Sequence, residues 1–185
     1  QHHESQQWLE RQLKKQVPAE YFLLTFTLPA EFRALVFAHQ SVVYDLLMRC
    51  TWETVRTFSQ NDKQLRGTPG AIAVLHTNTR RLDYHPHVHL VMPAAAVDGQ
   101  RRLWRTKRRG KGKGGYLFNN QALAKVFRAK LLAAIEAAGL TLPCRHPEKW
   151  VVDCKSVGSG ESDSFPLAVV RVEGDVARIL TLPGN

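Results

Sequence analysis

Apolar residues follow two patterns along this chain, and together they divide it into strands and helices. Short apolar and aromatic runs bounded by turn-forming residues predict strands at 21–28, 71–76, 86–93 and 149–157. Apolar residues at helical spacing predict helices within 4–16, 30–60 and 119–138. Ser41 is a candidate N-cap, so the pattern over 30–60 favours two helices. The final pattern, over 166–182, predicts a hairpin around Glu173-Gly174-Asp175.

The order of these elements predicts the fold class. After the N-terminal helix, the chain reads strand, helix, strand, strand, helix, strand. Consecutive strands without a helix between them commonly pair as antiparallel hairpins. We therefore expect an α+β fold, with an antiparallel β-sheet and helices packed on one face.

Three histidines at alternate positions stand out in the strand over 86–93. His85, His87 and His89 lead into the apolar run 90–92. Alternate residues of a strand point to the same face, so these imidazoles lie side by side. A solvated sheet face is the simpler explanation. However, so dense a cluster repels itself when protonated, and imidazole is a common ligand of catalytic metals. The pattern favours a metal site.

The third ligand has two candidates. His76 ends the preceding predicted strand, eleven positions before His87. If it pairs opposite His87 or His89, it shares their face, whereas a slip of one residue turns it away. His85 is the alternative, although Pro86 cannot donate a hydrogen bond to a neighbouring strand, which places His85 where the strand only begins. We predict that His87 and His89 bind a metal with His76, and His85 remains the rival.

Composition and charge indicate the kind of partner. The chain has 185 residues, 26 Lys and Arg against 16 Asp and Glu, and a net charge of +10. This excess favours a polyanionic partner, most simply nucleic acid. The three scattered cysteines form no CxxC pair, which is typical of a reducing compartment. We find neither a signal peptide nor an apolar run long enough for a membrane span, so we expect a cytoplasmic protein without a membrane partner.

The basic charge is concentrated in residues 101–113, RRLWRTKRRGKGK, which hold eight Lys or Arg and no acid. Basic side chains neutralise phosphates, and aromatic residues such as Trp104 and Tyr116 can stack on unpaired bases. The alternative is a solvated loop, which charged runs often form. We predict that this stretch contacts single-stranded DNA through Arg101, Arg102, Trp104, Arg105, Lys107, Arg108, Arg109, Lys111 and Lys113.

Four sequence blocks carry a family resemblance. His87-Val88-His89 is a His-hydrophobe-His (HUH) motif, and it lies within AVLHTNTRRLDYHPHVHLVMP. The other blocks are YFLLTFTLPAEFR, ALAKVFRAKLLAAI and WVVDCKSVGSGE. In this order they resemble the two-tyrosine HUH transposases of rolling-circle insertion sequences. The resemblance covers residues 1–161 and implies an HUH-endonuclease-like core there, with 162–185 as a divergent tail.

The resemblance also implies a chemistry. In that family the histidines hold a divalent ion, usually magnesium or manganese, which polarises a phosphodiester. A tyrosine then attacks and leaves a 5′-phosphotyrosine and a free 3′-hydroxyl. Ligand softness alone favours zinc for imidazoles, so magnesium or manganese follows from the resemblance. The function expected is DNA transposition by nicking and joining of single strands in a bacterial cytoplasm.

The chain also departs from the family. Family members carry a cysteine-rich zinc-binding segment before the region that begins here, and a helix with the catalytic tyrosine after the GSGE block. Residues 162–185 contain no tyrosine, and the four tyrosines of the chain are Tyr21, Tyr44, Tyr84 and Tyr116. Tyr84 is near the histidines in sequence, but a tyrosine in a strand or turn more often packs. We therefore expect a truncated, cleavage-deficient fragment and assign no catalytic residue.

Two other functions remain as alternatives. The first is a non-catalytic module that binds metal and single-stranded DNA. The second is a three-histidine zinc hydrolase that acts on another kind of substrate. The basic stretch argues against the hydrolase, and Asp83 is the nearest carboxylate to the histidines in sequence. The sequence predicts no oligomeric state.

Overall fold

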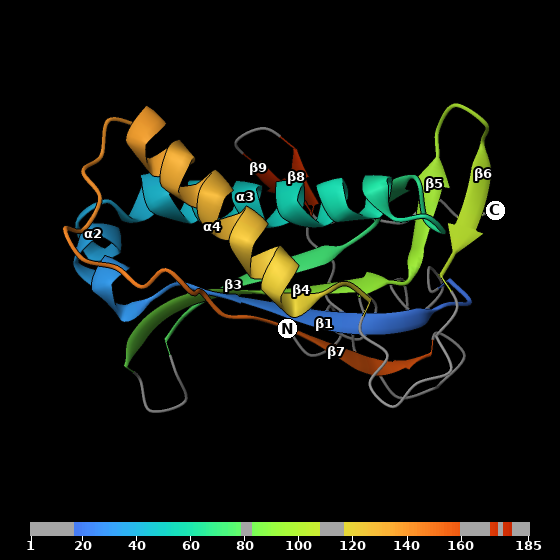
Figure 1. The fold of residues 1–185 in the computed structure, drawn as a ribbon, viewed down its shortest axis with the longest axis horizontal. Helices are drawn as coiled ribbons and strands as arrows, with labels where there is room; N and C mark the ends of the chain where they lie inside the picture. The colour runs from blue at the N-terminus through green and yellow to red at the C-terminus, as the bar shows by residue number, and fades with distance from the viewer. Residues whose placement is uncertain (1–16, 79–82, 108–116, 160–170, 174–175, 179–185) are drawn as a thin grey trace, which may run out of the picture.

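A four-stranded antiparallel sheet forms the centre of the computed structural model, which describes residues 17–78, 83–107, 117–159, 171–173 and 176–178. Its strands lie in the order β3–β4–β1–β7. Their bounds are β1 Glu20–Thr27, β3 Ile72–Asn78, β4 Tyr84–Pro93 and β7 Val152–Ser159. The long helices α3 (Gln40–Asn61) and α4 (Asn120–Ala137) lie on the same side of this sheet (Figure 1). The predicted α+β fold with helices on one face is confirmed.

The helices begin and end close to where the sequence predicts. A 3₁₀ turn, η1 (Ala30–Phe32), and the short helix α2 (Arg33–Ala38) precede α3, so 30–60 does hold more than one helix. The break lies at His39, however, and Ser41 is inside the first turn of α3, so the predicted Ser41 cap is wrong. Asn119 caps α4 through its side chain, which accepts a hydrogen bond from the Ala122 N–H.

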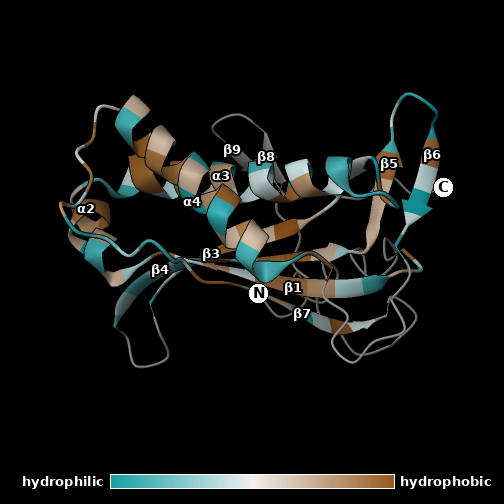
Figure 2. Cartoon of the chain, in the orientation of Figure 1, coloured by the Kyte–Doolittle hydropathy of each residue, from teal (hydrophilic) through white to brown (hydrophobic). Residues whose placement is uncertain are grey.

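Strand alternation separates a buried face of the sheet from an open one. In β1, Phe22, Leu24 and Phe26 are buried against the helices, and the Phe26 ring meets Phe127 of α4 edge-on at 5.0 Å. In β4 the buried set is Val88, Leu90 and Met92. Figure 2 shows apolar residues where the helices face the sheet. The intervening residues of β1 and β4, including the histidines, therefore lie on the face away from the helices.

A second, three-stranded sheet combines a strand before β3 with two strands after β4, and it includes part of the basic stretch 101–113, for which a solvated loop was the alternative. Its order is β2–β5–β6, with β2 Thr68–Pro69, β5 Ala95–Asp98 and β6 Leu103–Thr106. Arg101 and Arg102 lie in the β5–β6 turn, whereas Trp104 and Arg105 belong to β6. The loop prediction is therefore wrong for 103–106. The predicted DNA-contacting residues Arg108, Arg109, Lys111 and Lys113 lie outside the described residues, as does Tyr116.

Near the C-terminus, β8 (Arg171–Glu173) and β9 (Val176–Arg178) pair antiparallel as a two-stranded ribbon. The hairpin predicted over 166–182 includes these strands, and its turn at 174–175 lies outside the described residues. The helix predicted over 4–16 lies outside them as well. In the part of the chain that the structure describes, no helix has the length and apolar character needed to span a bilayer.

Candidate metal centre

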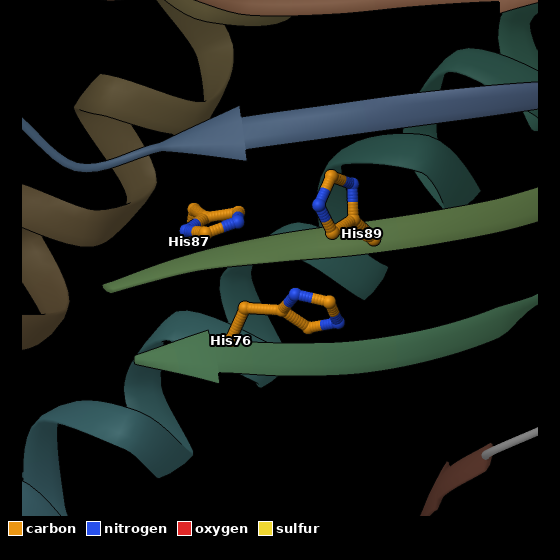
Figure 3. Close-up of side chains that lie close together, drawn as sticks. All are labelled: His76, His87 and His89. Atoms are coloured by element: carbon orange, nitrogen blue, oxygen red, sulfur yellow. The ribbon is translucent and has the colours of Figure 1, made fainter. Parts of the chain in front are cut away.

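The β3–β4 register brings three histidines together on the open face. His76 of β3 is the backbone partner of His87, and His89 lies two residues further along β4. One ligand nitrogen from each lies within 4.8 Å of the other two. Figure 3 shows the three imidazoles, one from β3 and two from β4, pointing toward one another. The structure therefore places the three predicted metal ligands in one cluster.

The cluster has the dimensions of a site for one ion. Imidazole nitrogens bind divalent metals such as zinc at about 2.0–2.1 Å, so two ligand nitrogens of one ion are at most about 4.2 Å apart. The three ligand nitrogens, which lie within 4.8 Å of one another, are close to that limit. The ring centroids of His76 and His89 are already 4.6 Å apart. Three neutral imidazoles leave the full charge of a divalent ion uncompensated, which suits an anionic ligand such as phosphate.

Backbone and side-chain partners orient two of the rings. The Nδ1 of His87 lies 2.7 Å from the carbonyl oxygen of His85. A carbonyl only accepts, so Nδ1 carries the proton and Nε2 keeps a free lone pair. The Nδ1 of His89 lies 3.1 Å from the hydroxyl of Thr25, its neighbour across the β1–β4 pair. In the tautomer that donates to this hydroxyl, Nε2 of His89 is also free to bind a metal.

His85 has a different partner, which decides between the two candidate third ligands. Its Nδ1 lies 3.2 Å from Nη2 of Arg33. A guanidinium only donates, so Nδ1 of His85 accepts and the proton of the neutral ring sits on Nε2. Neither nitrogen then has a free lone pair. The geometry therefore favours His76 over His85 as the third ligand.

The histidine environment also favours the neutral rings that a metal needs. Burial, followed by the nearby His76 and His87, lowers the pKa of His89 below its ordinary value of 6.5. Burial, followed by His87 and Arg33, lowers the pKa of His85 as well. Protonated imidazoles cannot ligate, so a lowered pKa keeps His89 competent to bind metal at a more acidic pH.

Thr25 is a functional candidate that sequence analysis missed. We expect Thr25→Val to weaken manganese binding by about 10–100-fold, the usual cost of losing the partner that orients a metal-bound imidazole. Thr25→Ser keeps the hydroxyl and should bind close to the parent. Isothermal titration calorimetry at one pH compares the three proteins. Equal weakening by valine and serine would show that Thr25 acts through packing instead.

The described tyrosines do not face the histidines. Tyr84 lies on the same face of β4 as the buried residues Val88, Leu90 and Met92, and its hydroxyl lies 2.8 Å from that of Tyr44 on α3. Burial and the Tyr44 hydrogen bond raise the pKa of Tyr84, which disfavours the phenolate. Tyr21 is buried near the start of β1, opposite Pro93, and its hydroxyl accepts the Val17 N–H. Neither position suits a nucleophile for a phosphate held by the histidines.

The described basic residues of the predicted DNA-contacting stretch lie at the other end of β4. From His87 to Pro93 the strand runs six residues, or about 20 Å. Lys107 stabilises the fold, because its ammonium lies 2.5 Å from a carboxylate oxygen of Asp62 and 2.8 Å from the carbonyl oxygen of Leu117. Trp104 is 39% exposed. Of this stretch, Lys107 is thus a structural residue, while Trp104 and the turn arginines are accessible.

Comparison with known sequences decides the family. Residues 70–165, just over half of the chain, match a family described as "Putative transposase". This chain belongs to the two-tyrosine transposase family. The matched region of the transposase chain contains all three clustered histidines, which places the cluster inside the family domain.

Two curated transposases are similar to the chain. Over 132 residues it is 33% identical to "Putative transposase y4qJ" of Sinorhizobium fredii (strain NBRC 101917 / NGR234), covering 71% of this chain and 32% of that protein. Over 94 residues it is 33% identical to the transposase for insertion sequence element IS801 of Pseudomonas savastanoi pv. phaseolicola, covering 51% of this chain and 22% of that protein. The chain thus spans a third or less of the length of these relatives.

Among solved structures, the transposase chain is similar to the conjugative relaxase TrwC in complex with OriT DNA. The metal-bound form gives a TM-score of 0.49 at 19% identity over 73% of this chain and 49% of that chain. The metal-free form gives 0.48 at 20% identity over 71% and 48%. Both scores are below 0.5, so the family assignment rests on sequence.

Proposed function

We propose that this chain is the metal- and DNA-binding core of a transposase that nicks and joins single-stranded DNA. The observation that carries the proposal is the convergence of His76, His87 and His89 in a member of the two-tyrosine transposase family. We propose residues 1–161 as this core and 162–185 as a separate tail.

The chain's own residues prepare the site for a phosphodiester. The His85 carbonyl and the Thr25 hydroxyl hold the His87 and His89 rings with Nε2 free, so little reorganisation is needed when an ion binds. In the described part of the chain, His76 is exposed and His87 and His89 are half-buried, so a nucleic-acid strand can reach the cluster. A divalent ion held there, which we propose to be manganese or magnesium, would act as a Lewis acid on a phosphate oxygen.

Among the described residues, no tyrosine is positioned as the nucleophile of the phosphotyrosine step. Residues 162–185 contain no tyrosine, and Tyr44 and Tyr84 lie on the helix side of the sheet. We therefore propose that this chain binds metal and DNA without cleaving.

A three-histidine zinc hydrolase is the second candidate, because the ligand set is all nitrogen and suits zinc. Such an enzyme also needs a general base close to its metal. In the described part of the chain, the metal-ligating cluster includes no carboxylate. The net charge of +10 further favours a DNA partner over a small neutral substrate.

Oligonucleotide binding tests the proposal. We expect the parent chain to bind a fluorescein-labelled single strand more tightly with manganese than with EDTA, because the bound ion contacts a phosphate. His87→Ala should bind equally in both conditions, at the EDTA level of the parent. Fluorescence anisotropy measures both. Equal DNA affinity of the parent chain with manganese and with EDTA would contradict the proposal. Zinc-dependent ester hydrolysis without DNA binding would contradict it as well.

A further inference from the structure

An arginine-lined hollow lies where the end of α3 meets the β5–β6 hairpin. It has a volume of about 430 Å³, and its polar lining includes Gln60, Arg66, Asp98, Gln100, Arg101 and Arg105. Figure 1 shows the C-terminal end of α3 beside the hairpin, and Figure 2 shows that the turn between β5 and β6 is hydrophilic. This hollow is separate from the histidine cluster, which lies on the opposite face of the central sheet.

Backbone strain marks the arginines around this hollow. Among the described residues, only Arg66 (φ 41°) and Arg102 (φ 53°) have a positive φ without being glycine. Residues with a side chain rarely adopt this conformation, and it persists mostly where the surrounding structure enforces it, often at functional sites. Arg66 lines the hollow, and Arg102 lies in the adjoining turn. Both arginines with this uncommon backbone conformation thus lie at or beside the hollow.

Close packing fixes the position of Arg66. A Cβ on the next residue, Gly67, would meet the carbonyl oxygen of Val97 at 2.6 Å, so the loop presses directly on β5. Arg66 itself is exposed, and in the described part of the chain no acidic group pairs with its guanidinium. The fold thus holds this side chain at the rim of the hollow without using its charge.

The hollow carries a positive charge that its one carboxylate does not cancel. Asp98 pairs with Arg105 at 3.2 Å and accepts the backbone N–H groups of Gln100 and Arg101, both at 3.2 Å. The Arg101 hydrogen bond comes first among the causes that lower the pKa of Asp98, so the carboxylate stays ionised and shapes the turn. Three guanidinium groups against one carboxylate leave a formal charge of +2. The Nε of Arg105 is buried without a hydrogen-bond partner.

We infer that this hollow is a second DNA-binding site, which takes a backbone phosphodiester between Arg66, Arg101 and Arg105. Guanidinium groups match the oxygen geometry of phosphate and bind it without reading sequence. The inference rests on the proposed function, because it takes DNA as the partner. The histidines lie toward the start of β4, and the β5–β6 hairpin follows its end at Pro93, so one DNA strand must run along the molecule to reach both sites.

The test is the salt dependence of DNA binding for Arg66→Gly, with Lys125→Ala as the matched control. Glycine removes the guanidinium and relieves the strained φ, and Lys125 is an exposed residue of α4 that loses the same charge. The probe is a fluorescein-labelled single-stranded oligonucleotide, titrated in EDTA. For Arg66→Gly we expect binding about fivefold to tenfold weaker and a salt slope smaller by about 0.7–0.9, the value for one lost phosphate contact. Lys125→Ala should keep the parent slope.

Three outcomes would overturn the inference. They are an unchanged slope for Arg66→Gly, equal slopes for Arg66→Gly and Lys125→Ala, and no binding of the oligonucleotide by the parent. Arg101→Gln is a second variant, which leaves the Arg66 backbone unchanged. The salt slope of its DNA binding should fall by the same amount. Because the titration contains no divalent ion, failure of the hollow leaves manganese-dependent binding intact, and failure of the metal centre leaves the slope difference intact.

Discussion

Replacing His87 by alanine is expected to weaken manganese binding by at least about 100-fold, whereas His85→Ala should bind close to the parent. Loss of a residue that only orients a ligand already costs about 10–100-fold, so loss of the ligand itself costs at least the upper value. His85 is the matched control, because it lies on the same strand and face while Arg33 occupies its Nδ1. Isothermal titration calorimetry at a pH above 6.5 measures all of these affinities.

The same series decides the third ligand. His76→Ala should lose manganese affinity as severely as His87→Ala, because each supplies one ligand nitrogen to the cluster. A His85→Ala protein that loses manganese while His76→Ala retains it would make His85 the ligand. That result would show that the Arg33–His85 hydrogen bond breaks when the ion binds.

The second large effect is an absence: incubation with oligonucleotide and manganese should give no covalent protein–DNA adduct. In-line attack needs a nucleophile within about 3–3.5 Å of phosphorus. Tyr84 cannot meet this requirement in the described fold, since its hydroxyl lies with Tyr44 beneath the opposite face of the sheet. Denaturing gel electrophoresis of a labelled single strand detects an adduct with high sensitivity.

Formation of a covalent adduct would instead identify a nucleophile in this chain. If an adduct forms, mass spectrometry of the peptide–DNA product maps it, and Tyr84→Phe and Tyr116→Phe show which hydroxyl reacts. An adduct on either tyrosine that disappears in His87→Ala would contradict the non-cleaving function proposed for this chain. Manganese-dependent binding without an adduct agrees with it.

Much of the fold follows from local patterns in the sequence. The aromatic run 21–28 and the apolar run 71–76 became β1 and β3, and Asn119 caps α4. The shared face of His87 and His89 follows from strand alternation alone. The place of His76 does not, because a connection too long for defined turn chemistry leaves the β3–β4 register open by one residue. The structure pairs His76 with His87, which is the register the site needs.

The parts that sequence analysis missed depend on long-range contacts. Thr25 lies 64 residues from His89, and Arg33 lies 52 residues from His85, so only the folded sheet brings these partners together. The β5–β6 hairpin was missed for another reason. Strand β6 has four residues, is largely exposed and lies within a basic stretch, so its strand conformation depends on pairing with β5. The strain at Arg66 is likewise visible only in backbone geometry.

The central claim is that three histidines hold one divalent ion where a DNA phosphate can reach it. Anomalous diffraction from crystals grown with manganese and a short single-stranded oligonucleotide tests it most directly. We expect one manganese peak within about 2.0–2.2 Å of a ring nitrogen of His76 and of Nε2 of His87 and His89, with a phosphate oxygen completing its coordination. A peak bound by His85 in place of His76, or crystals with ordered DNA and no metal at the cluster, would contradict it.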